Sequence, residues 1–159
     1  MRRRRRAGFT LLELVVVALI IGLLARVFTP RLLHFRKRGQ AAHIVADLGA
    51  IRAAAFQFMA DSLHWPAASP PGVIPPEIQP FLPPSLRFTP EGGVVYEWRL
   101  TGMPDGNPVA ATEGATMGMG ADIEDDGLRE EVQRNLQGQT TLTSGTTVYW
   151  LLWGPTTRP

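Results

Sequence analysis

Residues 8–14 have the sequence GFTLLEL, and they open an apolar run that continues to residue 25. Within this run the only polar side chains are those of Thr10 and Glu13. Extended to residue 28, the run reaches the ~20 residues that an α-helix needs to cross the hydrocarbon core of a bilayer. Arg26 stands late enough to extend its guanidinium toward lipid head groups. The segment therefore predicts a membrane-spanning helix.

Basic residues flank the apolar run on both sides. Five consecutive arginines, Arg2 to Arg6, precede it, and a second basic group at residues 31–38 follows it. Cytoplasmic flanks of membrane spans usually carry more Lys and Arg, but here the two flanks carry nearly equal numbers. From Ala41 onward acidic residues outnumber basic ones, so the rest of the chain has no overall basic character.

The chain has 159 residues, which suffices for one modest domain in addition to a membrane segment. It contains no cysteine, and this excludes disulfide bonds and thiolate metal sites. Any domain must therefore be held together by packing alone, or by its neighbours.

A helical pattern continues beyond Pro30, which we expect to kink the helix or to free one backbone carbonyl. Apolar residues recur at helical spacing up to Asp61 and Ser62, whereas Asp47 and Arg52 are expected to point away from this stripe. A helix from Phe9 to that point would measure roughly 80 Å, far more than one small core requires. The apolar stripe comprises Leu33, Ala41, Ile44, Leu48, Ile51, Ala55, Phe58 and Met59.

The remainder of the chain predicts a loop followed by a small sheet. Residues 66–90 hold nine of the fourteen prolines. We expect an ordered loop there, because Ile74, Ile78, Phe81 and Leu82 can anchor it; a low-complexity linker is the alternative. Alternation and β-branched residues predict strands at 94–100 and 146–153, with weaker strands at 109–112 and 115–119. A short amphipathic helix is predicted at 128–136, and a turn at 103–108.

Glu13 is the most unusual feature of the apolar run. A charged side chain in hydrocarbon costs roughly 2.5–3.5 kcal/mol and normally has a partner or a function. The nearest cation within the span is Arg26, about 20 Å along a helix, so we expect no intramolecular partner for Glu13. Neither a cleaved secretory signal nor a simple signal anchor uses such a carboxylate. A nucleic-acid-binding arm accounts for the arginines but not for the apolar run beside them.

The order of basic leader, glycine, phenylalanine, threonine, leucine pair, glutamate and long apolar run resembles the processing site of type IV prepilins and type II secretion pseudopilins. The resemblance covers about residues 2–30. It implies that a prepilin peptidase cuts between Gly8 and Phe9 and that the new amino terminus, Phe9, is N-methylated. Glu13 then matches the family's carboxylate four residues beyond that terminus. Together with Thr10, it is assigned to assembly.

The same resemblance implies a pilin-like α+β fold, with a long amino-terminal helix packed on a small antiparallel sheet. Residues 1–8 form the removed leader, 9–29 the transmembrane and filament-core half of the helix, and 30–159 the periplasmic or extracellular domain. The chain is expected to be a structural subunit of a pilus or secretion pseudopilus, without cofactor. A membrane-anchored binding module that does not polymerise is the alternative.

The partners that follow from the resemblance are other copies or related pilin-like subunits, the prepilin peptidase, an inner-membrane assembly platform and the lipid bilayer. No nucleic acid is among them. The precursor is expected in the bacterial inner membrane with its leader in the cytoplasm, and the product in a periplasmic or extracellular filament.

No pattern in the sequence predicts an enzyme. No serine lies in a nucleophile-elbow sequence, and His34 and His43, nine residues apart, lie on opposite sides of a helix. Residues 122–127 are acidic, and some major pseudopilins bind calcium in a carboxy-terminal loop. Their spacing does not match an EF-hand. We expect Asp125 or Asp126 to cap the following helix instead.

Overall fold

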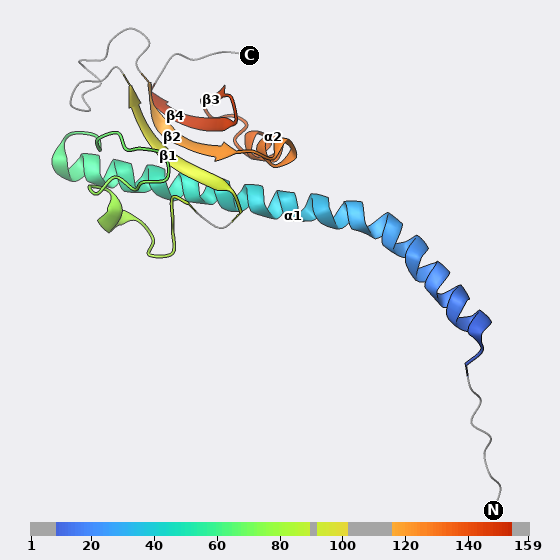
Figure 1. Ribbon diagram of the computed structural model, residues 1–159. Helices are drawn as coiled ribbons and strands as arrows, with labels where there is room; N and C mark the ends of the chain where they lie inside the picture. Colours follow the sequence, from blue (N-terminus) through green and yellow to red (C-terminus); the bar gives the residue numbers. More distant parts are fainter. Residues whose placement is uncertain (1–8, 90–91, 102–115, 154–159) are drawn as a thin grey trace, which may run out of the picture. The chain divides into compact units, whose positions relative to one another are not determined.

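The computed structural model describes residues 9–89, 92–101 and 116–153 (Figure 1). The chain divides into two compact units, residues 1–36 and 37–159, and each is described by itself. The predictions for residues 103–108 and 109–112 lie outside the described part. The elements are α1 (Leu11–Ser62), a 3-10 turn η1 (Gln79–Phe81), β1 (Val94–Thr101), β2 (Thr116–Ile123), α2 (Asp126–Asn135), β3 (Thr141–Ser144) and β4 (Thr147–Trp153).

Helix α1 runs for 52 residues without interruption. Its backbone remains helical at Pro30, so the prediction that the helix continues beyond this residue is confirmed. Just before it, the Thr29 hydroxyl donates to the Ala25 carbonyl at 2.7 Å, a bond that occurs where helices bend. By length and composition α1 is able to cross a membrane.

The second part of α1 packs along the sheet in unit 37–159 (Figure 1). The predicted apolar stripe is confirmed there: Ala41, Ile44, Leu48, Ile51 and Ala55 are buried. Leu33, also predicted in the stripe, is 53% exposed, so the buried part of the stripe begins at Ala41.

Asp47 does not point away from the core, contrary to our expectation. Its Oδ2 accepts a hydrogen bond from the Tyr96 hydroxyl at 2.8 Å and lies 3.1 Å from His43 Nδ1. Burial, and then the hydrogen bond to Asp47, raise the pKa of Tyr96 above its usual value. The polar contact joins α1 to β1.

The sheet has four antiparallel strands in the order β1-β2-β4-β3. As predicted, Val94, Tyr96 and Trp98 share one face of β1 and are buried toward α1. The other face is not fully exposed, as simple alternation predicts, because Glu97 is also buried. Strand β3 was not predicted. It is four residues long and lies at the edge, where it pairs with β4 through a two-residue turn at Gly145 and Thr146. Gly145 has φ 61°, as the first position of such a turn requires.

The other face of the sheet is closely packed around two glycines of β2. A Cβ at Gly120 would lie 2.7 Å from the Tyr149 ring, and one at Gly118 would lie 2.5 Å from the Trp150 carbonyl oxygen. The Tyr149 hydroxyl donates to the buried carboxylate of Glu97. Burial and this hydrogen bond raise the pKa of Tyr149 to about 12.

The proline-rich segment is an ordered loop, as predicted. Ile78 is fully buried, Leu82 is nearly so, and Ile74 and Phe81 pack against the same core. The indole N–H of Trp98 donates to the Pro66 carbonyl at 3.0 Å and ties the start of the loop to β1. The α+β architecture predicted from the sequence is therefore confirmed.

Candidate functional site: the amino-terminal assembly segment

Thr10 and Glu13 form a reciprocal set of hydrogen bonds at the start of α1. Glu13 Oε2 accepts from the Thr10 backbone N–H and from the Thr10 hydroxyl, both at 3.1 Å. The Glu13 backbone N–H donates to Thr10 Oγ1 at 3.2 Å. This is a capping box, in which two side chains satisfy backbone groups that the first helical turn leaves open.

The expectation that no intramolecular group reaches Glu13 is therefore wrong. Thr10 supplies hydrogen-bond donors to this carboxylate, although no cation of the span lies near it. The signal was readable, since threonine followed three residues later by glutamate is the sequence pattern of this box. The carboxylate is only partly used, because among the described residues no hydrogen bond reaches Glu13 Oε1.

The surface around this box is apolar and uncovered. Phe9 is 75% exposed, and Leu11 and Leu12 are exposed to a similar extent. A helix with apolar side chains on all sides is unfavourable in water and is suited to a lipid or protein environment. Gly8, the residue before the predicted cut, lies outside the described residues.

A second polar cluster lies in unit 37–159, where α2 begins. Asp125 is the N-cap of α2, as expected: its Oδ1 accepts from the Leu128 N–H at 2.7 Å. The same oxygen accepts from Lys37 Nζ at 2.8 Å. The Lys37 hydrogen bond, followed by that from Leu128, holds the pKa of Asp125 below its usual value.

The described residues do not fit a calcium ion at this cluster. Asp125 Oδ1 is already bonded to an amide and to a competing cation, and Asp126 pairs with Arg129. Asp122 has a buried Oδ1 without a hydrogen-bond partner, but one carboxylate does not meet the six to eight oxygen ligands that calcium takes. Within the described ranges no group of three His, Cys, Asp or Glu side chains could hold a metal.

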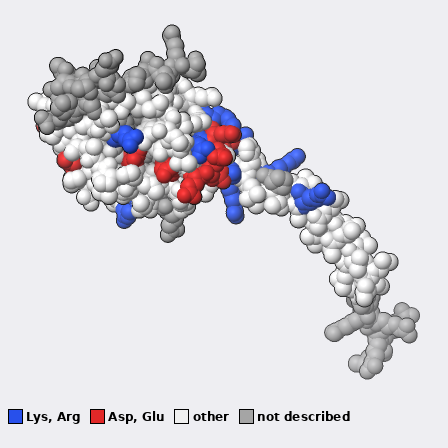
Figure 2. Space-filling model, turned by 45° about the horizontal axis from the view of Figure 1, so that its top comes forward, with Lys and Arg blue, Asp and Glu red and all other residues white. Residues whose placement is uncertain are grey.

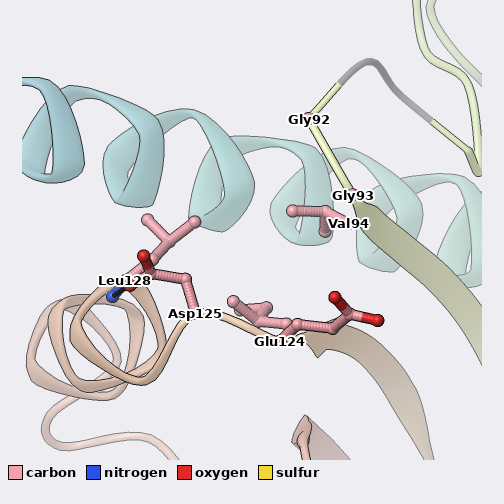
Figure 3. A pocket seen from close by; sticks show the side chains of 7 residues that line it. Gly92, Gly93, Val94, Glu124, Asp125 and Leu128 are labelled. Atoms are coloured by element: carbon pink, nitrogen blue, oxygen red, sulfur yellow. Dashed lines mark hydrogen bonds between the residues drawn. The ribbon is translucent and has the colours of Figure 1, made fainter.

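A pocket of about 360 Å³ adjoins the cap (Figure 3). Its lining comes from the start of β1, the end of β2 and the start of α2, namely Gly92, Gly93, Val94, Ile123, Glu124, Asp125 and Leu128. These described lining residues include no histidine, cysteine, serine or lysine, and the carboxylate of Glu124 is directed away from that of Asp125 (Figure 3). They therefore supply no nucleophile paired with a base.

Residues 3–25 match the family model described as the prokaryotic N-terminal methylation motif. The chain is 32% identical over 95 residues to type II secretion system core protein G of Klebsiella michiganensis, covering 60% of this chain and 66% of that protein. It is 33% identical over 108 residues to core protein G of Aeromonas hydrophila, covering 68% of this chain and 73% of the relative.

The core protein G of Escherichia coli K12 is 34% identical over 104 residues, which cover 65% of this chain and 69% of that protein. No solved structure gives a significant match. The methylation motif coincides with the segment that carries the capping box, and the similarity extends well beyond that motif into the sheet-bearing unit. The chain belongs to the family of type II secretion system core protein G.

Proposed function

We propose that this chain is a structural, non-catalytic subunit of the pseudopilus of a type II secretion system. The observation that carries the proposal is an exposed apolar helix whose first part, up to residue 25, lies within the methylation motif. The precursor is held in the inner membrane with residues 1–8 in the cytoplasm. Prepilin peptidase removes this leader, and an inner-membrane platform passes residues 9–159 into a periplasmic filament of identical or related subunits.

The proposed division of the product is a filament-core segment, residues 9–29, and an exported domain, residues 30–159. Inside the filament the apolar side chains of the first segment exchange lipid for neighbouring helices. Because lipid and protein interiors are similarly apolar, this exchange gives little net driving force. Specificity must therefore come from side-chain packing and from polar groups.

The polar contact that we propose joins Glu13 of one subunit to the amino terminus of another. Cleavage before Phe9 creates a cation four residues from Glu13. If a neighbouring subunit is shifted outward by about 6 Å, four residues at 1.5 Å each, its Phe9 amine is level with this carboxylate. Thr10 donates its two hydrogen bonds to Glu13 Oε2, so Oε1 is the oxygen available to the neighbour. The capping box thus orients the carboxylate, and assembly supplies its counter-charge.

Two substitutions at one position test the charge of Glu13 with and without its capping hydrogen bond. Glu13→Gln keeps a side-chain oxygen for the capping box and removes the charge, whereas Glu13→Ala removes both. Both variants should be inserted and cleaved normally, and both should fail to form filaments in cells that contain the secretion machinery. Thr10→Ser, which preserves the cap, is the matched control and should assemble as the parent chain does.

The measurements are the mass of the mature amino terminus and the yield of sheared filaments by electron microscopy. The parent chain should begin at a methylated Phe9. An intact leader in cells with active prepilin peptidase would refute the proposal and favour a membrane-anchored module. Normal filament yield from Glu13→Gln would show that the charge is not needed.

A further inference from the structure

The stretch of α1 that follows the membrane-spanning run carries an exposed apolar stripe. Phe28, Leu32 and Phe35 are each more than half exposed. At about 100° per residue they lie within roughly 60° of one another around the helix, so their side chains form one face. A groove of about 460 Å³ lies on this face, and all of its lining belongs to unit 1–36. The lining consists of Phe28, Thr29, Arg31, Leu32 and Phe35.

Two arginines border this stripe, one on each side. Arg31 lies about 60° from Phe28 around the helix in one direction, and Arg36 lies about 80° from it in the other. Both are exposed, and in the described part of the chain neither forms an ion pair. Arg26, in contrast, lies about 160° from Phe28, on the opposite side of the helix. The apolar stripe therefore has a cation along each edge.

Arg31 is the hydrogen-bond donor of the groove. The Thr29 hydroxyl already donates to the Ala25 carbonyl at 2.7 Å, and the other three lining side chains are hydrocarbon. A guanidinium binds phosphate and carboxylate groups well. A guanidinium beside apolar walls therefore suits an anionic group that is attached to hydrocarbon.

The groove lies at the level of lipid head groups in the proposed membrane-held chain. About twenty helical residues from Phe9 cover the ~30 Å thickness of the hydrocarbon core and end near Phe28. Arg31 then lies about 4.5 Å beyond this boundary, within a head-group layer of roughly 5–7 Å, and Phe35 lies at the outer margin of that layer.

Helix α1 itself carries no carboxylate at this level. No Asp or Glu occurs between Glu13 and Asp47, so a neighbouring α1 that is staggered by a few residues offers these arginines no counter-charge. On the face drawn in Figure 2, this stretch of α1 carries basic side chains on an otherwise uncharged surface. The phosphate of a lipid supplies the charge that a neighbouring helix lacks.

We infer that this groove binds one anionic phospholipid. Arg31 holds the phosphate, and Phe28 and Leu32 pack against the glycerol backbone and the first acyl carbons. A zwitterionic lipid fits less well, because its own cation is repelled by Arg31 and Arg36. The inference rests on the proposed function for the insertion of the chain with its leader in the cytoplasm, which places the groove in the periplasmic leaflet.

Photo-cross-linking tests the site in the processed full-length chain, inserted into nanodiscs of equal parts phosphatidylglycerol and phosphatidylcholine with identical acyl chains. Phe35→benzoylphenylalanine places a photoreactive group at the groove. The matched control is Leu33→benzoylphenylalanine, because Leu33 is also exposed and lies roughly 130° around the helix from the middle of the stripe. The mass of each adduct identifies the molecule that lies against that position.

Adducts at Phe35 should contain phosphatidylglycerol about fivefold more often than phosphatidylcholine, since one arginine at an anionic surface contributes about 1 kcal/mol. Adducts at Leu33 should show the equal ratio of the bulk lipid. Arg31→Gln should bring the Phe35 ratio close to that bulk value. Arg26→Gln removes the same charge from the opposite side of the helix and should leave the Phe35 ratio unchanged.

Three results would overturn the inference: the bulk ratio at Phe35 in the parent chain, equal effects of the two glutamine variants, or adducts at Phe35 that join two copies of the chain instead of a lipid. The proposed function is tested separately. Normal filaments from a parent chain without lipid preference at Phe35 would contradict the inference alone. A leader that stays on in cells with active prepilin peptidase would contradict the proposed function.

Discussion

Asp125 makes two contacts with one carboxylate, and different substitutions separate them. Asparagine retains a side-chain oxygen for the Leu128 amide but removes the charge that pairs with Lys37. Alanine removes both. Loss of an N-cap costs about 1 kcal/mol, and an exposed ion pair contributes about 0.2–1 kcal/mol. The ion pair belongs to the exposed class, since its side chains are 37% and 51% exposed.

We therefore expect Asp125→Asn to lower the free energy of unfolding by about 0.5 kcal/mol and Asp125→Ala by about 1.5 kcal/mol. Urea unfolding of the full chain in detergent, followed by tryptophan fluorescence, measures both. In a Lys37→Met background the cost of Asp125→Asn should vanish, whereas the alanine variant should still lose the cap. Equal costs for asparagine and alanine, or an unchanged asparagine cost in that background, would refute the assignment of the two contacts.

The lowered pKa of Asp125 adds a pH test with a definite sign. A carboxyl whose pKa is lower in the folded chain than in the unfolded chain stabilises the fold at pH values above its unfolded-state pKa. That contribution is lost as the pH falls below about 4. The parent chain should therefore lose more stability over this window than Asp125→Asn. Calcium should not change the melting temperature; a rise that disappears in Asp125→Ala would contradict the cap as the role of this residue.

The remaining predictions concern the sheet and its core. Both tyrosines, Tyr96 and Tyr149, have raised pKa values, so absorbance at 295 nm should show no tyrosinate in the folded chain near pH 10, while the urea-unfolded chain titrates there. Because the folded pKa of Tyr149 is about 12, its contribution to stability should decline as pH rises from about 10, and Tyr149→Phe should weaken this decline. Gly118→Ala should destabilise the fold by about 1–3 kcal/mol, because its Cβ would meet backbone. Gly49→Ala, with open space at its Cβ, should stabilise α1 by up to about 1 kcal/mol; equal effects of the two alanines would contradict the packing.

The sequence predicted the elements whose patterns are long and strongly periodic. The apolar stripe from Ala41 to Ala55 and the apolar positions of β1 each recur several times, and these apolar side chains are buried as expected. Strand β3 has only four residues, half-buried or exposed, and lacks such a repeat. Its signal was local: Gly145 stands at the first position of the two-residue turn, Gly145 and Thr146, that precedes β4.

Contacts between residues far apart in the chain were beyond the reach of local pattern. The Tyr96–Asp47 and Trp98–Pro66 hydrogen bonds join residues 49 and 32 positions apart. Asp47 looked like a solvent-facing charge because its partner is known only once β1 is placed. The Thr10–Glu13 box is different, because its pattern is local: the partners of Glu13 are uncharged hydrogen-bond donors three residues away, not a balancing charge.

Isotope labelling of filaments tests the assembly contact most directly. Subunits labelled with ¹⁵N at phenylalanine are mixed with subunits labelled with ¹³C at the glutamate carboxylate, so that a coupling between the labels arises only between molecules. Solid-state NMR should detect the Phe9 amine within about 5 Å of the Glu13 carboxylate carbon, as an ion pair requires. Well-formed mixed filaments in which the Phe9 nitrogen shows no such proximity would contradict the intermolecular counter-charge.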